Sequence, residues 1–288
     1  MASQQNAWNE TVIKLGISTC PNDTFIYQNL IEGKVKTPCS ISVEYADVQT
    51  LNEKVLQGSL DIAKVSAAVF PLVSNKYRLL KSGGAMGYGC GPLLLSSVEE
   101  NFNANLAIHL PGKNTTAAAL LNFWLKRNNK ESSLEYSRFD SLYRNMCEKK
   151  IAQGVAIHEH RFTWQRDGLH LIADLGAFWE QELKAPIPLG CTVIKKELGE
   201  ELANEMDLLI QKSLKLAWER KDPITDFIRK LAQIDDDTVI LQHIKMFVND
   251  YSMDMLQSGN AEKPNLFSPL QMLFANMQGG QIKILTEM

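Results

Sequence analysis

Residues 12–25 have the sequence VIKLGISTCPNDTF, and this stretch decides the fold. Its first seven residues are rich in Val, Ile and Leu and alternate in part, which predicts a buried strand. Pro21 ends the strand, and Asn22 to Thr24 offer several N-cap candidates for a helix that we expect from about Thr24 to Leu30. A strand followed at once by a helix predicts the first half of a βαβ unit.

The alternation of strands and helices continues downstream. We expect a second strand at residues 40–45. Thr50 and Glu53 have the spacing of a capping box, which predicts a helix that starts there and ends at Gly58. Residues 60–65 form the next expected strand, and Ser66 would start another helix. This order implies a mainly parallel sheet covered by helices.

Five glycines lie within residues 83–91, and such a segment needs unusual backbone angles or the close approach of another group. It lacks the spacing of a dinucleotide or phosphate loop, so we expect a tight connection between lobes instead. Strands and helices alternate again through residue 158, including a helix from about residue 140 to Gln153 that Gly154 would close. Residues 186–194 would cross back before a mostly helical region.

The predicted architecture is α/β with two lobes and a central ligand cleft, like type 2 periplasmic binding proteins. A larger, discontinuous lobe would take residues 1–96 and 195–288, and a smaller α/β lobe residues 97–194. This assignment is an architectural analogy that rests on two crossings between the lobes.

Composition limits the possible functions. The 288 residues include 45% hydrophobic and 22% charged residues, with a net charge of −3 and no basic run, which argues against nucleic acid and anionic membrane as partners. The N-terminus has neither a cationic start nor an apolar core, and no apolar run approaches the roughly 20 residues that span a bilayer. Five cysteines without a CxxC pair predict reduced thiols in the cytoplasm.

Parallel sheets place ligands at the carboxyl ends of their strands, beside helix N-termini. Four segments meet this condition, and we expect them to face one cleft from both lobes: residues 18–24, 64–66, 114–116 and 157–160. The candidate ligand contacts in them are Ser18, Asn22, Asp23, Thr24, Lys64, Ser66, Thr115 and Thr116. The alternative is that the hydroxyl, amide and carboxylate groups only cap helices and that the lysine lies at the surface.

His158 is the strongest catalytic candidate. An imidazole titrates near neutral pH and can act as a general base, although a lone histidine is more often structural. His158 and His160 could share a strand face, but no third ligand has suitable spacing, so we expect no metal. His109 is a lesser candidate, and we interpret Cys20 as a small core residue rather than a nucleophile.

Several stretches together resemble the 1,4-dihydroxy-6-naphthoate synthase family of menaquinone biosynthesis. The resemblance covers roughly residues 12–250, and the matching stretches are residues 17–25 (ISTCPNDTF), 60–66 (LDIAKVS), 87–93 (GYGCGPL), 111–117 (PGKNTTA) and 157–163 (IHEHRFT). The family more often has Asn at the position of His160.

This resemblance implies a lyase that converts cyclic dehypoxanthinyl futalosine to 1,4-dihydroxy-6-naphthoate and dihydroxyacetone without a metal or organic cofactor. By motif, His158 would be the proton acceptor. Lys64, Val65 and Ser66, with Thr115 and Thr116, would line the substrate site.

Three alternatives stay open at this point. A non-catalytic solute-binding protein of the same architecture is the main one, and the chorismate dehydratase of the same pathway is the second. The third is a regulatory ligand sensor, which should carry a DNA-binding helix pair or a basic patch, and the sequence shows neither.

Overall fold

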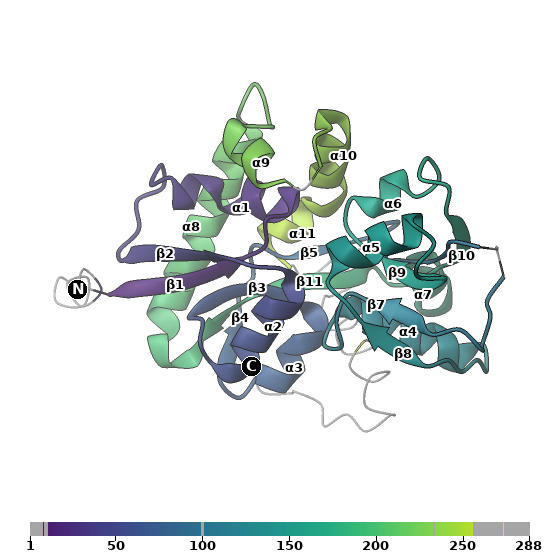
Figure 1. Cartoon of the computed structure of the whole chain (residues 1–288). Helices are drawn as coiled ribbons and strands as arrows, with labels where there is room; N and C mark the ends of the chain where they lie inside the picture. The colour runs from purple at the N-terminus through teal and green to yellow at the C-terminus, as the bar shows by residue number, and fades with distance from the viewer. Residues whose placement is uncertain (1–7, 9–10, 99–100, 233, 256–272, 274–288) are drawn as a thin grey trace. The chain divides into compact units, whose positions relative to one another are not determined.

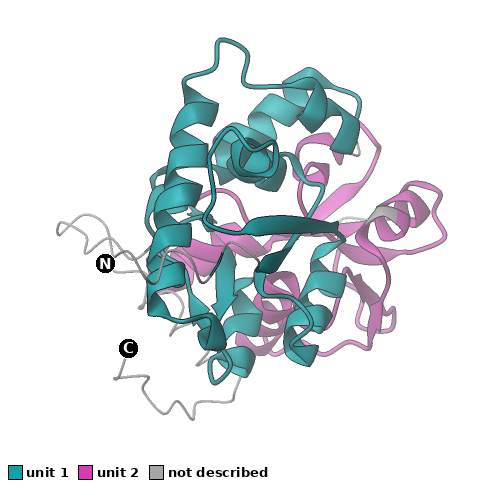
Figure 2. Cartoon of the chain, turned by 90° about the vertical axis from the view of Figure 1, so that its left-hand side faces the viewer, with its two compact units in different colours: residues 1–87, 190–255 teal, residues 88–189, 256–288 magenta. Residues whose placement is uncertain are grey.

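The computed structural model describes residues 8, 11–98, 101–232, 234–255 and 273. The described chain forms two compact units, coloured separately in Figure 2. Unit 1 contains the residues up to Gly87 and those from Gly190 to Met255, and unit 2 contains Tyr88–Leu189. The α/β class of both units agrees with the prediction.

The crossings lie earlier than the sequence predicted. The predicted boundaries followed residues 96 and 194, whereas the chain changes units after Gly87 and after Leu189. Strand β6 (Leu93–Ser96) accounts for the first difference, because it pairs with β9 and β10 in the sheet of unit 2. The last part of the predicted larger lobe, residues 256–288, lies outside the described residues except for residue 273.

Unit 1 is built around a mixed sheet (Figure 1). Its strands are β1 (Val12–Ile17), β2 (Ser40–Tyr45), β3 (Ile62–Ser66), β4 (Tyr77–Leu79), β5 (Ala85–Gly87) and β11 (Ile187–Lys195). Its helices are α1 (Pro21–Ile31), α2 (Val48–Gln57), η1 (Ala67–Val69), α3 (Phe70–Val73), η2 (Lys196–Leu198), α8 (Glu200–Trp218), α9 (Asp226–Leu231), α10 (Asp237–Phe247) and α11 (Asp250–Met253).

The strand order is β2-β1-β3-β11-β4, with β5 paired to β11. Strands β1, β2 and β3 are parallel, as the βαβ pattern predicted, but β11 runs antiparallel to β3 and β4. The expectation of a mainly parallel sheet was therefore only half right. The returning chain enters β11 opposite the carboxyl end of β3, where Gly190 pairs with Ser66, so it can only run the other way.

The core of unit 1 explains why the strand–helix stretch at its start decides the fold. Ile13, Leu15 and Ile17 of β1 are fully buried, as are Phe25 and Ile26 of α1. Helix α1 packs against α8, α9 and α10 (Figure 1). A buried apolar side chain contributes roughly 1.5–3 kcal/mol relative to an exposed one, so this layer supplies much of the unit's stability.

Unit 2 has its own mixed sheet, in the order β10-β6-β9-β7-β8. The elements besides β6 are β7 (Ile108–Leu110), α4 (Thr116–Arg127), β8 (Leu134–Tyr136), α5 (Phe139–Cys147), β9 (Gln153–Ala156), α6 (His160–Thr163), β10 (His170–Asp174) and α7 (Leu175–Leu183). Strands β7, β8 and β9 are parallel, whereas β6 is antiparallel to both β9 and β10.

Helix ends show where local signals were sufficient. Gly58 ends α2 in the left-handed conformation with φ 76°, as predicted, because glycine has no Cβ to clash there. The predicted capping box was wrong: Asp47 caps α2 and accepts hydrogen bonds from the Gln49 and Thr50 amides. Helix α5 ends at Cys147, and Gly154 lies inside β9, where a Cβ would come within 2.7 Å of Met146 Sδ.

Candidate active site

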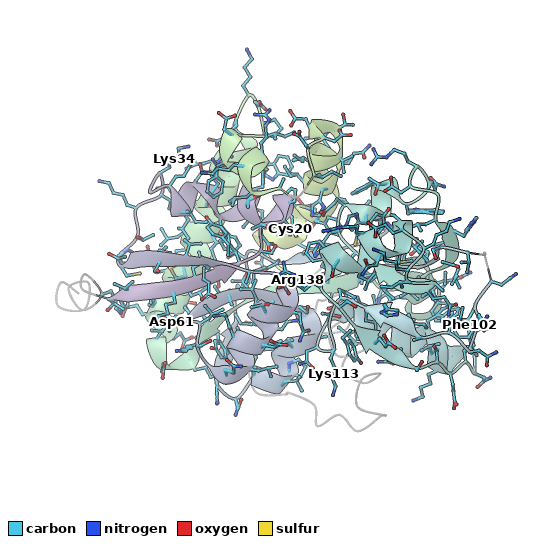
Figure 3. The ribbon with its side chains drawn as sticks, in the orientation of Figure 1. Cys20, Lys34, Asp61, Phe102, Lys113 and Arg138 are labelled. Carbon is cyan, nitrogen blue, oxygen red and sulfur yellow. The ribbon has the colours of Figure 1, made fainter. Side chains whose placement is uncertain are left out.

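The predicted residues of unit 1 gather at one edge of its sheet. Strands β1 and β3 are parallel neighbours, with Leu15 paired to Ile62. Their carboxyl ends therefore lie side by side, which places Ser18 and the start of α1 next to the end of β3. Cys20, labelled in Figure 3, occupies the N-cap position of α1 and is buried.

Ser18, Asn22 and Asp23 form a buried hydrogen-bonded chain. The Ser18 hydroxyl donates to Asp23 Oδ2 at 2.7 Å, and Asn22 Nδ2 donates to Asp23 Oδ1 at 2.8 Å. The three side chains are 4%, 7% and 3% exposed, respectively. Buried polar groups of this kind must be hydrogen-bonded, and here they satisfy one another. Their predicted role as ligand contacts stays a prediction.

His243 extends this chain, which the sequence analysis did not predict. Its Nε2 lies 2.9 Å from Asn22 Oδ1, and the residue is fully buried on α10. Because Asn22 Nδ2 donates to Asp23, Asn22 Oδ1 is the acceptor, and His243 Nε2 must carry the proton. Helical spacing marked this face of α10 as apolar, which is why the histidine looked ordinary.

Lys64 is a buried lysine of unit 1. Only 6% of the residue is exposed, and its Nζ donates to the Gly83 carbonyl oxygen at 2.5 Å. Burial lowers the pKa of the Lys64 ammonium, while the charge of the Asp23 carboxylate acts in the opposite direction. Burial also raises the pKa of the Cys191 thiol to about 12, so this thiol is neutral at physiological pH.

Ser66 ends β3 with its backbone and side chain already paired to Asn52 of α2. The Ser66 amide donates to Asn52 Oδ1 at 2.9 Å, and Asn52 Nδ2 donates to Ser66 Oγ at 3.1 Å. Since Oγ is the acceptor in this contact, the Ser66 hydroxyl proton can be donated to another group. Its neighbour Val65 is buried and pairs with Cys191 in the sheet.

In unit 2, Thr115 and Thr116 lie at the start of α4, just beyond β7. Thr115 is the N-cap: its Oγ1 accepts from the Ala118 amide at 3.1 Å and donates to the Gly112 carbonyl oxygen at 2.9 Å. Thr116 Oγ1 donates to the Leu189 carbonyl oxygen at 2.8 Å. The sequence expected one of the two threonines to be the cap, and the structure identifies Thr115.

His158 lies at the same edge of the unit 2 sheet. It follows β9, whose parallel neighbour β7 leads to the threonines, so both segments leave the sheet in the same direction. The side chain of His158 is partly exposed, and its ring meets the Phe139 ring edge to face at 5.4 Å between centroids.

His158 also has an unusual backbone, with φ of 56°. The other non-glycine residues with positive φ in the described chain are Asn129, Lys149 and Lys184, and each lies at the C-terminal end of a helix. His158 instead lies between a strand and a helix. Strained conformations of this kind concentrate at functional sites.

The ring of His160 also lies near Phe139, at 6.4 Å between centroids, but its closest ring partner is another residue. Its ring stacks on Tyr143 of α5, with centroids 3.6 Å apart and an interplanar angle of 7°. Tyr143 in turn donates from its hydroxyl to Asp167 Oδ2 at 2.8 Å. Burial raises the pKa of the Tyr143 hydroxyl, which keeps it a neutral donor.

The described residues also bear on two other classes of protein, those that span a membrane and those that hold a metal ion. No helix in those ranges is both long enough and apolar enough to cross a bilayer. The same residues contain no group of three or more His, Cys, Asp or Glu side chains placed to hold a metal ion.

Solved structures agree with the fold. A protein of Archaeoglobus fulgidus superposes with a TM-score of 0.83 at 26% identity, covering 93% of this chain and 98% of that one. The alkanesulfonate-binding protein of Xanthomonas axonopodis pv. citri superposes with a TM-score of 0.69 at 12% identity, covering 94% and 95%. The second likeness shows the fold alone, and it confirms the predicted periplasmic-binding-protein-like class.

Sequence relatives identify the family. A 1,4-dihydroxy-6-naphthoate synthase of Thermus thermophilus is 35% identical over 256 residues, which cover 89% of this chain and 93% of that protein. The synthase of Streptomyces coelicolor is 32% identical over 251 residues, covering 86% and 89%. The profile of the menaquinone biosynthesis family matches residues 13–262. By each of these measures, the chain belongs to the menaquinone biosynthesis family.

Proposed function

We propose that this chain catalyses the conversion of cyclic dehypoxanthinyl futalosine into 1,4-dihydroxy-6-naphthoate and dihydroxyacetone. The observation that carries the proposal is the 35% identity to a 1,4-dihydroxy-6-naphthoate synthase over 89% of the chain. The reaction is a carbon–carbon lyase reaction. The two products together contain the atoms of the substrate, so the proposed reaction requires no second reactant.

In this proposal His158 is the general base. A neutral imidazole would take the proton of a substrate hydroxyl, and the oxygen electrons would form a carbonyl as the adjacent carbon–carbon bond breaks. The electron pair of that bond would enter the ring that becomes aromatic. The partly exposed ring and strained backbone of His158, just beyond a strand at the carboxyl edge of its sheet, support this role.

The proposal assigns substrate contacts to five residues that the family motifs imply. Ser66 has a hydroxyl proton to donate, and Lys64, two residues earlier on β3, supplies a buried N–H donor. Val65, Thr115 and Thr116 complete the set implied by the family motifs. Ser18, Asn22 and Asp23 belong to the proposal less directly, since in the structure their polar atoms bond to one another and to His243.

Incubation of the purified protein with cyclic dehypoxanthinyl futalosine, followed by mass detection of both products, tests the activity. We expect dihydroxynaphthoate and dihydroxyacetone in equal amounts. A parallel incubation with chorismate tests the dehydratase alternative, and substrate binding without turnover would support the solute-binding alternative. Absence of both products at high protein concentration would contradict the proposal.

His158→Gln tests the base without removing the bulk of the side chain. Loss of a general base typically lowers the rate by roughly 100- to 10,000-fold. His170→Gln is the matched control, because His170 is also partly exposed in unit 2 but lies at the opposite end of its sheet, at the start of β10. Equal turnover by the two variants would exclude His158 as the base.

A further inference from the structure

We propose that Arg161 is a positioning residue that, with Asp174, fixes the His158 turn in its left-handed conformation; this inference rests on the proposed role of His158. Arg161 lies three residues after His158, and its amide donates to the His158 carbonyl oxygen at 3.2 Å. The backbone of Arg161 therefore closes the turn that His158 opens.

The register of the unit 2 sheet shows what the Arg161 side chain can reach. Leu93, the first residue of β6, pairs with Ala156, the last residue of β9, and also with Asp174, the last residue of β10. The end of β9, the start of β6 and the end of β10 thus lie side by side at one edge of the sheet. The His158 turn leaves from this edge.

The guanidinium group of Arg161 bonds to a residue just before β6 and to the last residue of β10. Its Nη1 donates to the Gly91 carbonyl oxygen, just before β6, at 2.6 Å. Its Nη2 donates to Asp174 Oδ2 at 2.5 Å, and the two side chains are only 15% and 22% exposed. A guanidinium is planar and always charged, so two such bonds fix its direction as well as its position.

Both carboxylate oxygens of Asp174 accept hydrogen bonds. Its Oδ1 accepts a hydrogen bond from the Ala177 amide at 2.9 Å and so caps α7, while Oδ2 receives Arg161. Gly91, the other acceptor, packs directly on α7: a Cβ at Gly91 would lie 2.3 Å from Gly176 Cα. Arg161 thus connects the His158 turn to the chain just before β6 and to the end of β10, and both of these points contact α7.

The hydrogen bonds of Arg161 explain how His158 keeps an unfavourable backbone conformation. A left-handed residue with a Cβ is unfavourable and persists only where its surroundings fix it. The turn bond at Arg161 alone is local and weak, whereas the side-chain bonds tie the turn to strands of the sheet. A residue that fixes the base in this way affects the chemical step more than substrate binding.

The test uses Arg161→Lys and Asp174→Asn, with Arg166→Met as the control. Lysine keeps the charge but cannot make both bonds, and asparagine keeps an acceptor for the α7 cap. Arg166 is a nearby arginine whose side chain is 66% exposed and pairs with Asp167. We expect kcat to fall at least tenfold in both test variants with KM changed less than threefold, and no change in Arg166→Met.

The second readout is the ring resonance of each histidine in a ¹H–¹³C spectrum, with the His158 signal assigned by its absence in His158→Gln. In the test variants we expect the His158 signal to shift or broaden, while the signals of His109, His170 and His243 stay in place and report an intact fold. An unmoved His158 signal, unchanged kcat, or a rise in KM alone would overturn the inference. If the wild type shows no turnover, the proposed function fails, and the His158 resonance still decides the positioning role.

Discussion

His243 Nε2 lies 2.9 Å from Asn22 Oδ1, although 221 positions separate the two residues in sequence. The contact joins α10 to the start of α1 through a fully buried histidine. Asn22 connects this imidazole to the Asp23 carboxylate: its Oδ1 accepts from His243 Nε2, and its Nδ2 donates to Asp23 Oδ1. The start of α1 therefore depends on a helix from the far end of the chain.

Asn22→Ala should destabilise unit 1. The substitution removes two buried hydrogen bonds, the one between His243 Nε2 and Asn22 Oδ1 and the one from Asn22 Nδ2 to Asp23 Oδ1, which costs about 1–3 kcal/mol in the free energy of unfolding. Urea denaturation measures this loss. Asn105→Ala is the control, because Asn105 is exposed and should cost no more than about 0.5 kcal/mol.

Equal losses for the two asparagine variants would contradict the importance of the buried chain. KM of folded Asn22→Ala also bears on the ligand contact expected at this position. An unchanged KM would remove Asn22 from the proposed substrate site and leave it a structural role.

His158→Gly should be more stable than His158→Ala by about 1 kcal/mol, because glycine adopts positive φ without the Cβ clash that alanine retains. Both variants lose the ring, so the comparison isolates the backbone. Thermal or urea unfolding measures the difference. We expect turnover to be lost in both, which separates the stability of the turn from its activity.

Lys149 is the control position for the comparison of glycine with alanine at His158. Its φ is 57°, close to that of His158, but it lies just beyond α5 and is exposed. Lys149→Gly should exceed Lys149→Ala in stability by a similar amount, with turnover retained. If His158→Ala proved as stable as His158→Gly, the turn would not be strained.

Gly176→Ala should destabilise unit 2 by about 3 kcal/mol through overpacking. A Cβ at Gly176 would lie 2.6 Å from Gly91 Cα, which is backbone and cannot rotate away. Helix propensity alone predicts the opposite sign, a gain of about 1 kcal/mol for alanine in α7. The sign of the change in unfolding free energy therefore decides between close backbone contact and propensity.

Gly168→Ala is the reference for this prediction. Gly168 has φ of 73° and open space where a Cβ would lie, so only backbone strain of about 1 kcal/mol is expected. A smaller loss for Gly176→Ala than for Gly168→Ala would contradict the packing argument.

Lys64 should make stability depend on pH in a defined direction. Burial lowers its pKa in the folded protein from the ordinary value of 10.5. Well below the lowered pKa, both states are protonated and the full cost of burying the charge is present. As the pH rises toward 10.5, the folded state releases its proton before the unfolded chain does, so the free energy of unfolding rises.

Lys64→Met removes this term, so the stability of the wild type relative to Lys64→Met should increase with pH. Urea denaturation at several pH values from neutral to 10 measures the difference. Lys113→Met removes an exposed cation in unit 2 and controls for the general loss of a positive charge. A pH-independent difference for Lys64→Met would show that the ammonium is not desolvated.

Local patterns were sufficient to predict the class of fold. Apolar alternation gave β1, β2 and β3, and helix starts and stops such as Thr115 and Gly58 followed from backbone chemistry within one turn. The same local logic failed at Asp47 and Gly154. At Gly154 the deciding contact comes from Met146, in the helix packed against it, and no turn signal contains that information.

For the candidate site, too, some features could be predicted from the sequence and others only from the structure. The sequence by itself determined which residues stand at the carboxyl ends of strands, including Ser66, Thr115 and His158, because strand ends and helix starts are local features. Only the tertiary structure decided their partners: Asn52 for Ser66, His243 for Asn22, and Gly91 and Asp174 for Arg161. The physical reason is that periodicity encodes which face of an element is buried, whereas a hydrogen-bond partner is fixed only when the strand order and register of the sheet bring distant segments together.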